Sequence, residues 1–159
     1  MTSDALAIEL TAALNLTNTE WQQSRLFNRR PLERDRIVST LAHAVGDNDL
    51  KYLQAFLDEP RDVGTGATVV AFTERLVAIV RYSTTRLHAD ILPRSSLNGI
   101  RILRAPNLLG GGGSDKLILE LEYAHMLGSQ PITLGHKHQS PENVRALREF
   151  FPDLQRDFS

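Results

Sequence analysis

The sequence contains no cysteine, and this absence removes several kinds of chemistry at once. Disulfides, thiolate catalysis and cysteine-ligated zinc all need that residue. A chain without cysteine suits a reducing compartment, so we expect the protein to be cytoplasmic. The sequence also lacks an uncharged apolar run approaching the roughly 18 residues that a membrane-spanning helix needs.

A strong charge of either sign is absent as well. The chain has 18 Lys plus Arg and 19 Asp plus Glu, which gives a net charge of -1 and no overall attraction to nucleic acid or anionic membrane. This balance is still compatible with a local patch of one charge. The first residues have no basic segment, and Asp4 and Glu9 interrupt their apolar run, so we expect no signal peptide. The content of 42% hydrophobic and 23% charged residues indicates a globular protein.

Apolar residues at helical spacing predict four helices in the first 60 residues. The expected helices cover residues 4–16, a segment that begins near Asn18 and stops before Pro31, a segment from Pro31 that Gly46 ends, and a segment that begins at Asp47 and stops at Pro60. Thr17 and Glu20 have the spacing of a capping box for the second of them. Leu50, Leu53 and Leu57 would share one face of the fourth.

After residue 66 the pattern changes to short runs rich in β-branched residues. Six strands are expected, at residues 68–72, 76–83, 86–92, 98–104, 117–123 and 132–138. A final helix follows, with Ser140 as its cap, Pro141 in its first turn and Pro152 at its end. Strands joined by short connections favour antiparallel pairing, so the sequence predicts an α+β fold with a helical region over residues 1–60 and a β-domain over residues 61–159.

The β-part resembles a known family in the order of its elements. The words VVAFTERLVAIVRYS, LHADILPRSSLNGIRIL, LILELEY, PITLGHK and SPENVRALREFF follow one another as they do in bacterial pleckstrin-homology-like (PH-like) domains, over about residues 62–152. The resemblance implies an antiparallel sheet or partly open barrel with the terminal helix closing one end. It also implies binding of proteins, peptides or, in some members, anionic lipid headgroups. We count six strands where the family has seven, and the family does not require the N-terminal helices.

The candidate binding residues lie in the helical region. Five arginines gather there within a short stretch, offset only by Glu33 and Asp35, and such a group can hold the phosphates of a nucleic acid or a lipid surface. Trp21 and Phe27 lie beside them, and an exposed aromatic next to arginines is typical of a protein-binding hot spot. Burial of both aromatics, and a solvated arginine surface with a Glu33–Arg36 ion pair, are the alternatives. The five arginines are Arg25, Arg29, Arg30, Arg34 and Arg36.

Three further patterns suggest chemistry, and each has a simpler explanation. His136 and His138 would share a strand face and can chelate a metal, but a third ligand is not evident, so a solvent-facing edge is favoured. Glu120 and Glu122 alternate with leucines, as on the solvated face of a strand. After the run Gly110–Gly113 the lysine comes only after Ser-Asp, and a strand follows instead of the helix of a phosphate loop, so we expect a hairpin loop whose role the sequence does not define.

No motif specifies a reaction, and we therefore expect a non-catalytic protein-interaction module without cofactor or metal. Its partner is a protein or a second copy of the chain. A sheet edge at residues 87–92 or 132–138 is the expected docking strand, and the sequence does not decide between them. Peripheral binding of anionic lipid or nucleic acid through the arginines is the alternative function.

Overall fold

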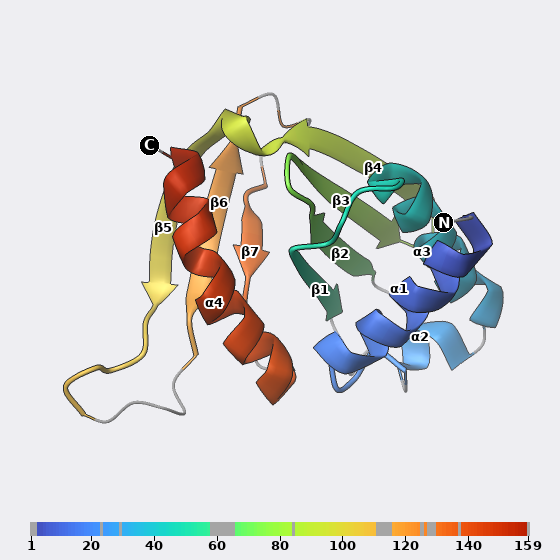
Figure 1. Ribbon diagram of the computed structural model, residues 1–159. Helices are drawn as coiled ribbons and strands as arrows, with labels where there is room; N and C mark the ends of the chain where they lie inside the picture. The colour runs from blue at the N-terminus through green and yellow to red at the C-terminus, as the bar shows by residue number, and fades with distance from the viewer. Residues whose placement is uncertain are drawn as a thin grey trace.

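The computed structural model describes residues 3–22, 24–28, 30–57, 66–83, 85–110, 116–124, 126, 130–136 and 138–158. Its elements are α1 (Ser3–Thr17), α2 (Arg25–Asn28), α3 (Pro31–Val45), β1 (Tyr52–Leu57), β2 (Ala67–Phe72), β3 (Leu76–Ser83), β4 (Arg86–Pro93), the 3-10 turn η1 (Arg94–Ser96), β5 (Leu97–Arg104), β6 (Ile118–Tyr123), β7 (Ile132–Leu134) and α4 (Pro141–Phe158) (Figure 1). The fold is α+β, as predicted. Its described strands form two antiparallel sheets, β1-β2-β3-β4 and β5-β6-β7, and not a closed barrel.

The four-stranded sheet is the middle layer of the molecule. Helices α1 to α3 cover one of its faces, and the three-stranded sheet with α4 lies against the other (Figure 1). Because successive side chains of a strand point to opposite faces, β2 sends Val69 and Ala71 toward the helices and Val70 and Phe72 toward the second sheet. Both faces are therefore buried over much of this sheet.

The predicted fourth helix is wrong, because residues 52–57 form strand β1. Leu53 and Leu57 match a helical period, but in the strand they lie on the face toward α1 and α3, with Ala55 between them. Tyr52 lies on the other face with the second core. A strand that is buried on both faces shows no polar alternation, so its apolar run reads equally well as a helix. This strand raises the count from six to seven.

The predicted second helix is reduced to one turn, α2. Asn18 uses its side chain instead: its Oδ1 accepts the N–H of Glu20 at 2.7 Å, and its Nδ2 donates to the carbonyl of Ala55 at 2.7 Å. Thr17 donates its hydroxyl back to Leu14 rather than capping a new helix. These contacts turn the chain at the point where the capping box was expected.

The other expected elements are present with small changes. Helices α1 and α3 are confirmed, and Gly46 ends α3 with a φ of +62°, a conformation that glycine adopts without strain. Strands β2 to β6 match the predicted segments within a residue or two. The sixth predicted strand is shorter than expected: β7 stops at Leu134, because Gly135 has a φ of +88°.

Helix α4 begins as predicted, since the Ser140 hydroxyl accepts the N–H of Asn143. It does not end at Pro152 but continues to Phe158. The last turn is held by Leu154, which is fully buried, and by an ion pair of Asp157 with Arg94. These contacts offset the backbone hydrogen bond that a proline inside a helix removes.

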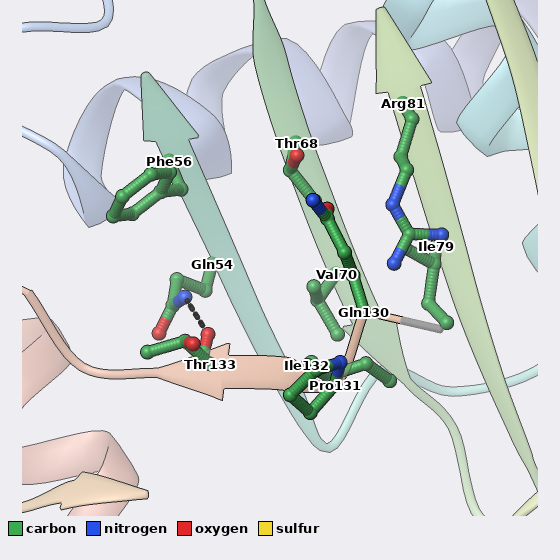
Figure 2. Close-up of a pocket in the computed structure, with 10 residues that line it drawn as sticks. All are labelled: Gln54, Phe56, Thr68, Val70, Ile79, Arg81, Gln130, Pro131, Ile132 and Thr133. Carbon is green, nitrogen blue, oxygen red and sulfur yellow. Dashed lines mark hydrogen bonds between the residues drawn. The ribbon is translucent and has the colours of Figure 1, made fainter. Parts of the chain in front are cut away.

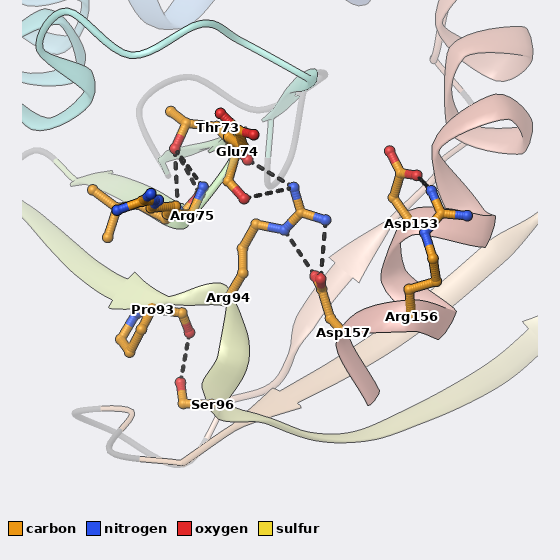
Figure 3. Close-up of polar contacts among 10 residues, drawn as sticks. Thr73, Glu74, Arg75, Pro93, Arg94, Ser96, Asp153, Arg156 and Asp157 are labelled. Carbon is orange, nitrogen blue, oxygen red and sulfur yellow. Dashed lines mark hydrogen bonds and ion pairs between the residues drawn. The ribbon is translucent and has the colours of Figure 1, made fainter. Parts of the chain in front are cut away.

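Arg94 joins three parts of the fold (Figure 3). Its Nε donates to Asp157 at 2.8 Å, and its Nη1 donates to the carbonyl oxygens of Thr73 and Glu74 in the turn between β2 and β3. The guanidinium also lies 5.2 Å from the centre of the Phe150 ring. The side chain is buried with all these partners around it, so it fixes the end of α4 against the four-stranded sheet.

Residue 60, the expected domain boundary, separates two parts that share a sheet. Strand β1 precedes it, and β2, its antiparallel partner, follows it. The turn after α1 is also bonded to the region before α4, through Thr19 to His138 and Ser140 to Thr17. Whether the two regions fold separately stays a prediction.

Candidate functional site

The inner face of the four-stranded sheet changes from apolar to polar along its strands. Strand pairing places its side chains in three rows: Tyr52, Phe72, Val77 and Leu92; then Gln54, Val70, Ile79 and Asp90; then Phe56, Thr68, Arg81 and His88. Phe150 of α4 covers the first row, with ring centres 5.5 Å from Tyr52 and 4.9 Å from Phe72. The third row lies beyond this cover and carries the polar groups.

A pocket of about 590 Å³, including its open mouth, lies over the second and third rows (Figure 2). Residues 130–133, which comprise the start of β7 and the two residues before it, form its opposite wall. Apolar side chains alternate with hydroxyl, amide and guanidinium groups around it. The lining residues are Gln54, Phe56, Thr68, Val70, Ile79, Arg81, Gln130, Pro131, Ile132 and Thr133.

Arg81 is the one charged residue in the described lining of this pocket. Its Nη1 lies 3.3 Å from the Asp90 carboxylate of the neighbouring strand, so the pair is neutral as a whole. The described lining also holds no acid and base side by side of the kind that proton transfer requires. The pocket therefore has the chemistry to bind a polar and apolar group together, and its lining gives no support to catalysis.

Gln54 closes the edge of β7 that faces the four-stranded sheet. Its Nε2 donates to the Thr133 carbonyl at 3.0 Å (Figure 2). Its Oε1 accepts the Gly135 N–H at 2.7 Å. The side-chain amide thus takes the place that the backbone of an added strand would occupy. Of the two docking edges left open by the sequence, the one at residues 132–138 is occupied from within.

Strand β4 is the free edge that corresponds to the other predicted segment. Among the described strands it pairs with β3 alone. The N–H of Arg94, the residue after β4, donates to the carbonyl of Arg75, the residue before β3, and backbone groups of successive residues point to alternate sides. This alternation directs the N–H and C=O groups of Leu87, Ala89 and Ile91 away from β3, into the space that an added strand would occupy.

A shallow groove runs beside this edge, between β4 and the outer flank of α3. Leu87 forms its strand side, and the helix side mixes one exposed leucine with polar groups. The described residues on the helix side are Leu32, Asp35, Arg36, Ser39, Thr40 and His43. An extended segment at the β4 edge would place alternate side chains over this groove.

The structure describes part of the predicted arginine cluster. Arg30 is exposed, Arg36 pairs with Glu33 at 3.0 Å as expected, and Arg34 donates to the Gln22 carbonyl at 3.3 Å. The side chain of Arg25 and the whole of Arg29 lie outside the described residues. The cluster therefore stays a proposal that rests mainly on Arg30.

Trp21 and Phe27 lie in the core between α3 and the sheet, and not on the surface. Trp21 has no exposed area, and its ring meets that of Phe27 edge-on with centres 5.0 Å apart. Phe27 in turn contacts Tyr82 of β3. Both side chains hold the helices to the sheet, so a partner cannot reach them in this conformation.

The two histidines do not form a solvent-facing strand edge. His136 follows the end of β7 and is buried against Phe56, with ring centres 5.2 Å apart. Burial lowers the pKa of His136 to about 4; the nearby Ala55 carbonyl opposes this shift, and His138 and Lys116 add to it. The described residues contain no group of three His, Asp or Glu that could hold a metal ion.

The remaining sequence candidates have structural roles or lie outside the described part. Glu122 is exposed and Glu120 half-buried, with Glu120 paired to Arg101 at 3.5 Å across the strands. Gly111–Gly113 of the glycine run are not described. No helix among the described residues is long and apolar enough to cross a membrane.

The comparisons with known proteins add no relative to this picture. No family model matches the chain, and neither a curated protein nor a solved structure does.

Proposed function

We propose that this chain is a non-catalytic, cytoplasmic protein-interaction module that binds an extended segment of a partner protein at the free edge of β4. The observation that carries the proposal is the outward direction of the backbone groups of Leu87, Ala89 and Ile91. An added strand gains its affinity from main-chain hydrogen bonds and its specificity from alternate side chains. The groove between α3 and Leu87 supplies contacts for those side chains.

The strand count supports the resemblance to PH-like domains as part of this proposal. The described strands number seven, in sheets of four and three with a terminal helix beside them. This number equals that of the family, whereas the sequence alone predicted six strands. The resemblance concerns only the order of the elements. The kind of partner is therefore inferred from the β4 edge and not from the family.

Ile91 gives a selective test of the proposal. It is half-exposed, its N–H points away from β3, and the residue before it is already extended, so Ile91→Pro removes one outward donor and keeps the β3–β4 ladder. Ile91→Val is the control, because it shortens the side chain by one carbon and retains the backbone N–H donor. Peptides selected from a displayed random library against the wild-type protein are the probe.

Selected peptides should bind wild type and Ile91→Val alike, and should bind Ile91→Pro about tenfold more weakly. Their binding should slow amide hydrogen exchange at Leu87, Ala89 and Ile91. Equal binding to Ile91→Pro, protection at another surface, or a library that yields no binding peptide would each contradict the β4 edge as the docking strand.

A second candidate function, binding of an anionic ligand at the arginine cluster, is favoured by the exposure of Arg30. Arg30→Ala should then weaken binding of single-stranded nucleic acid or anionic vesicles, and the affinity should fall steeply with salt. An affinity that changes neither with salt nor with Arg30→Ala would contradict this second function.

A further inference from the structure

The turn after β5 holds two leucines in solvent. Leu108 is 89% exposed and Leu109 is 100% exposed. The turn has a defined shape, because the Asn107 side-chain oxygen accepts the N–H of Leu109 at 3.2 Å and of Gly110 at 3.0 Å. Neighbouring apolar side chains that are this exposed often mark a site of interaction with a protein or a membrane.

The end of β5 extends this apolar surface. Ile102 and Leu103 are each about half exposed, at a β-bulge that interrupts the regular pairing of β5 with β6, so the end of the strand presents apolar side chains to solvent. We call these two residues, together with Leu108 and Leu109, the leucine tip.

Two arginines lie on the strand that leads to the leucine tip. Arg101 and Arg104 are exposed beside it, and Arg101 reaches Glu120 only through a surface pair at 3.5 Å with its own side chain 74% exposed. The sequence has no acidic residue between Asp90 and Asp115. The segment between these two acids therefore carries only positive charges beside its exposed apolar side chains. Such a combination is complementary to an anionic membrane, which has negative headgroups over an apolar interior.

We propose that the leucine tip is a peripheral membrane anchor, which inserts Leu108 and Leu109 into an anionic bilayer while Arg101 and Arg104 contact its phosphates. The shape of the tip supports a bilayer as the occupant. Residues 105–110, the described start of the β5–β6 connection, lead on beyond the end of β5 and away from α1 to α3 (Figure 1). A short turn at the end of a strand offers too little surface for the roughly 800 Å² that each partner contributes to a stable protein interface, whereas insertion into lipid needs only a few apolar side chains and nearby positive charge.

This anchor is separate from the proposed β4 docking edge. The groove beside that edge is formed by α3, which lies on the far side of the four-stranded sheet from β5 and β6 (Figure 1). A peptide and a membrane can therefore be bound at the same time, and failure of one proposal leaves the other standing.

The absence of cysteine makes a direct test simple, because Leu109→Cys creates a single labelling site. The full-length protein carries an environment-sensitive NBD fluorophore there, and is mixed with vesicles of phosphatidylcholine and phosphatidylserine. We expect a blue-shifted, brighter emission. Gln155→Cys, on the exposed face of α4, is the labelled control and should show no change.

Unlabelled variants measure the contributions by vesicle co-sedimentation. Leu108→Ser with Leu109→Ser should weaken binding at least about 30-fold. Arg101→Gln with Arg104→Gln should weaken it roughly 20-fold at low salt. Leu16→Ser, which removes a leucine that is 67% exposed on α1, should leave binding unchanged. Circular dichroism should show every variant folded, since all four positions of the double variants are exposed.

Three results would overturn the anchor. The first is an unchanged NBD spectrum with anionic vesicles. The second is equal binding by the double leucine variant. The third is equal binding to vesicles of phosphatidylcholine alone, which would remove the role of the arginines. If the tip instead contacts an apolar cleft on a protein, the vesicle signal is absent.

Discussion

Arg94 illustrates how much of the fold can depend on one buried side chain. Replacing it with methionine keeps the contact with the Phe150 ring but leaves the Asp157 carboxylate and two carbonyl oxygens without their donor. Breaking a buried ion pair from one side costs about 3 to 5 kcal/mol, so Arg94→Met should lower the free energy of unfolding by about 3 kcal/mol. Urea denaturation measures this loss.

Arg156 provides the matched control, since it pairs with Asp153 on the same helix with 72% of its side chain exposed. Such surface pairs contribute about 0 to 1 kcal/mol, and Arg156→Met should change stability within that range. Equal effects of the two substitutions would mean that the contacts of Arg94 are not what holds the last turn of α4.

His136 should make stability depend on pH in a defined window. Its pKa is lowered to about 4 by burial, against about 6.5 in the unfolded chain. Between these values the unfolded state binds a proton that the folded state does not, so the free energy of unfolding falls as pH drops from about 6.5 to 4, by up to about 3 kcal/mol. Above pH 6.5 this contribution is constant.

Urea denaturation at several pH values measures the slope. His136→Leu should flatten it, whatever that substitution does to stability at pH 7, because the titrating group is gone. A wild-type slope in His136→Leu would assign the pH dependence to other groups.

At the scale of elements, Gln54 determines which sheet edges are open. Its amide bonds Thr133, Gly135 and Tyr52 and is almost fully buried. Gln54→Met fills a similar volume but leaves a backbone donor and an acceptor of the β7 edge unpaired, which should cost about 2 to 3 kcal/mol. Amide exchange at Gly135 should speed up more than at Val70 in the neighbouring strand. Uniform acceleration would contradict a local role for Gln54.

The sequence predicted correctly those elements whose apolar residues repeat with the period of one kind of secondary structure. Strands β2 to β6 and helices α1 and α3 were found because β-branched runs and apolar stripes are local signals. Strand β1 was missed because both of its faces are buried, and with it Gln54 and Phe56 of the pocket were missed. The burial of His136 depends on the left-handed turn at Gly135, where a Cβ atom would lie 2.3 Å from the Leu117 carbonyl. Contacts this far apart in the chain leave no periodic trace.

The candidate site was predictable to a similar extent. The sequence named two segments as candidate docking edges, residues 87–92 and 132–138, but it could not show that Gln54, on another strand, closes the second. It also placed Trp21 at the surface as one alternative, and only the packing of α2 and α3 against the sheet decides for burial. The leucines of the tip carried no sequence signal, because exposure is a property of the fold.

At the scale of the whole molecule, the helices and the sheet should unfold together. The core between them mixes residues from both sides of position 60, such as Leu10 and Trp21 with Val69 and Val80. The hydrogen bond from Asn18 to Ala55 and the strand pair of β1 with β2 cross the same boundary region. Trp21 is the single tryptophan, so its fluorescence reports on the core between the helices and the four-stranded sheet.

Urea unfolding followed by Trp21 fluorescence should therefore have the same midpoint as that followed by methyl resonances of Leu119 and Leu134 in the other core. The isolated segment 61–159 should give the poorly dispersed spectrum of an unfolded chain, because it lacks β1 and exposes the apolar face that α1 and α3 cover. An earlier Trp21 transition together with a folded 61–159 segment would instead divide the chain into two domains at residue 60.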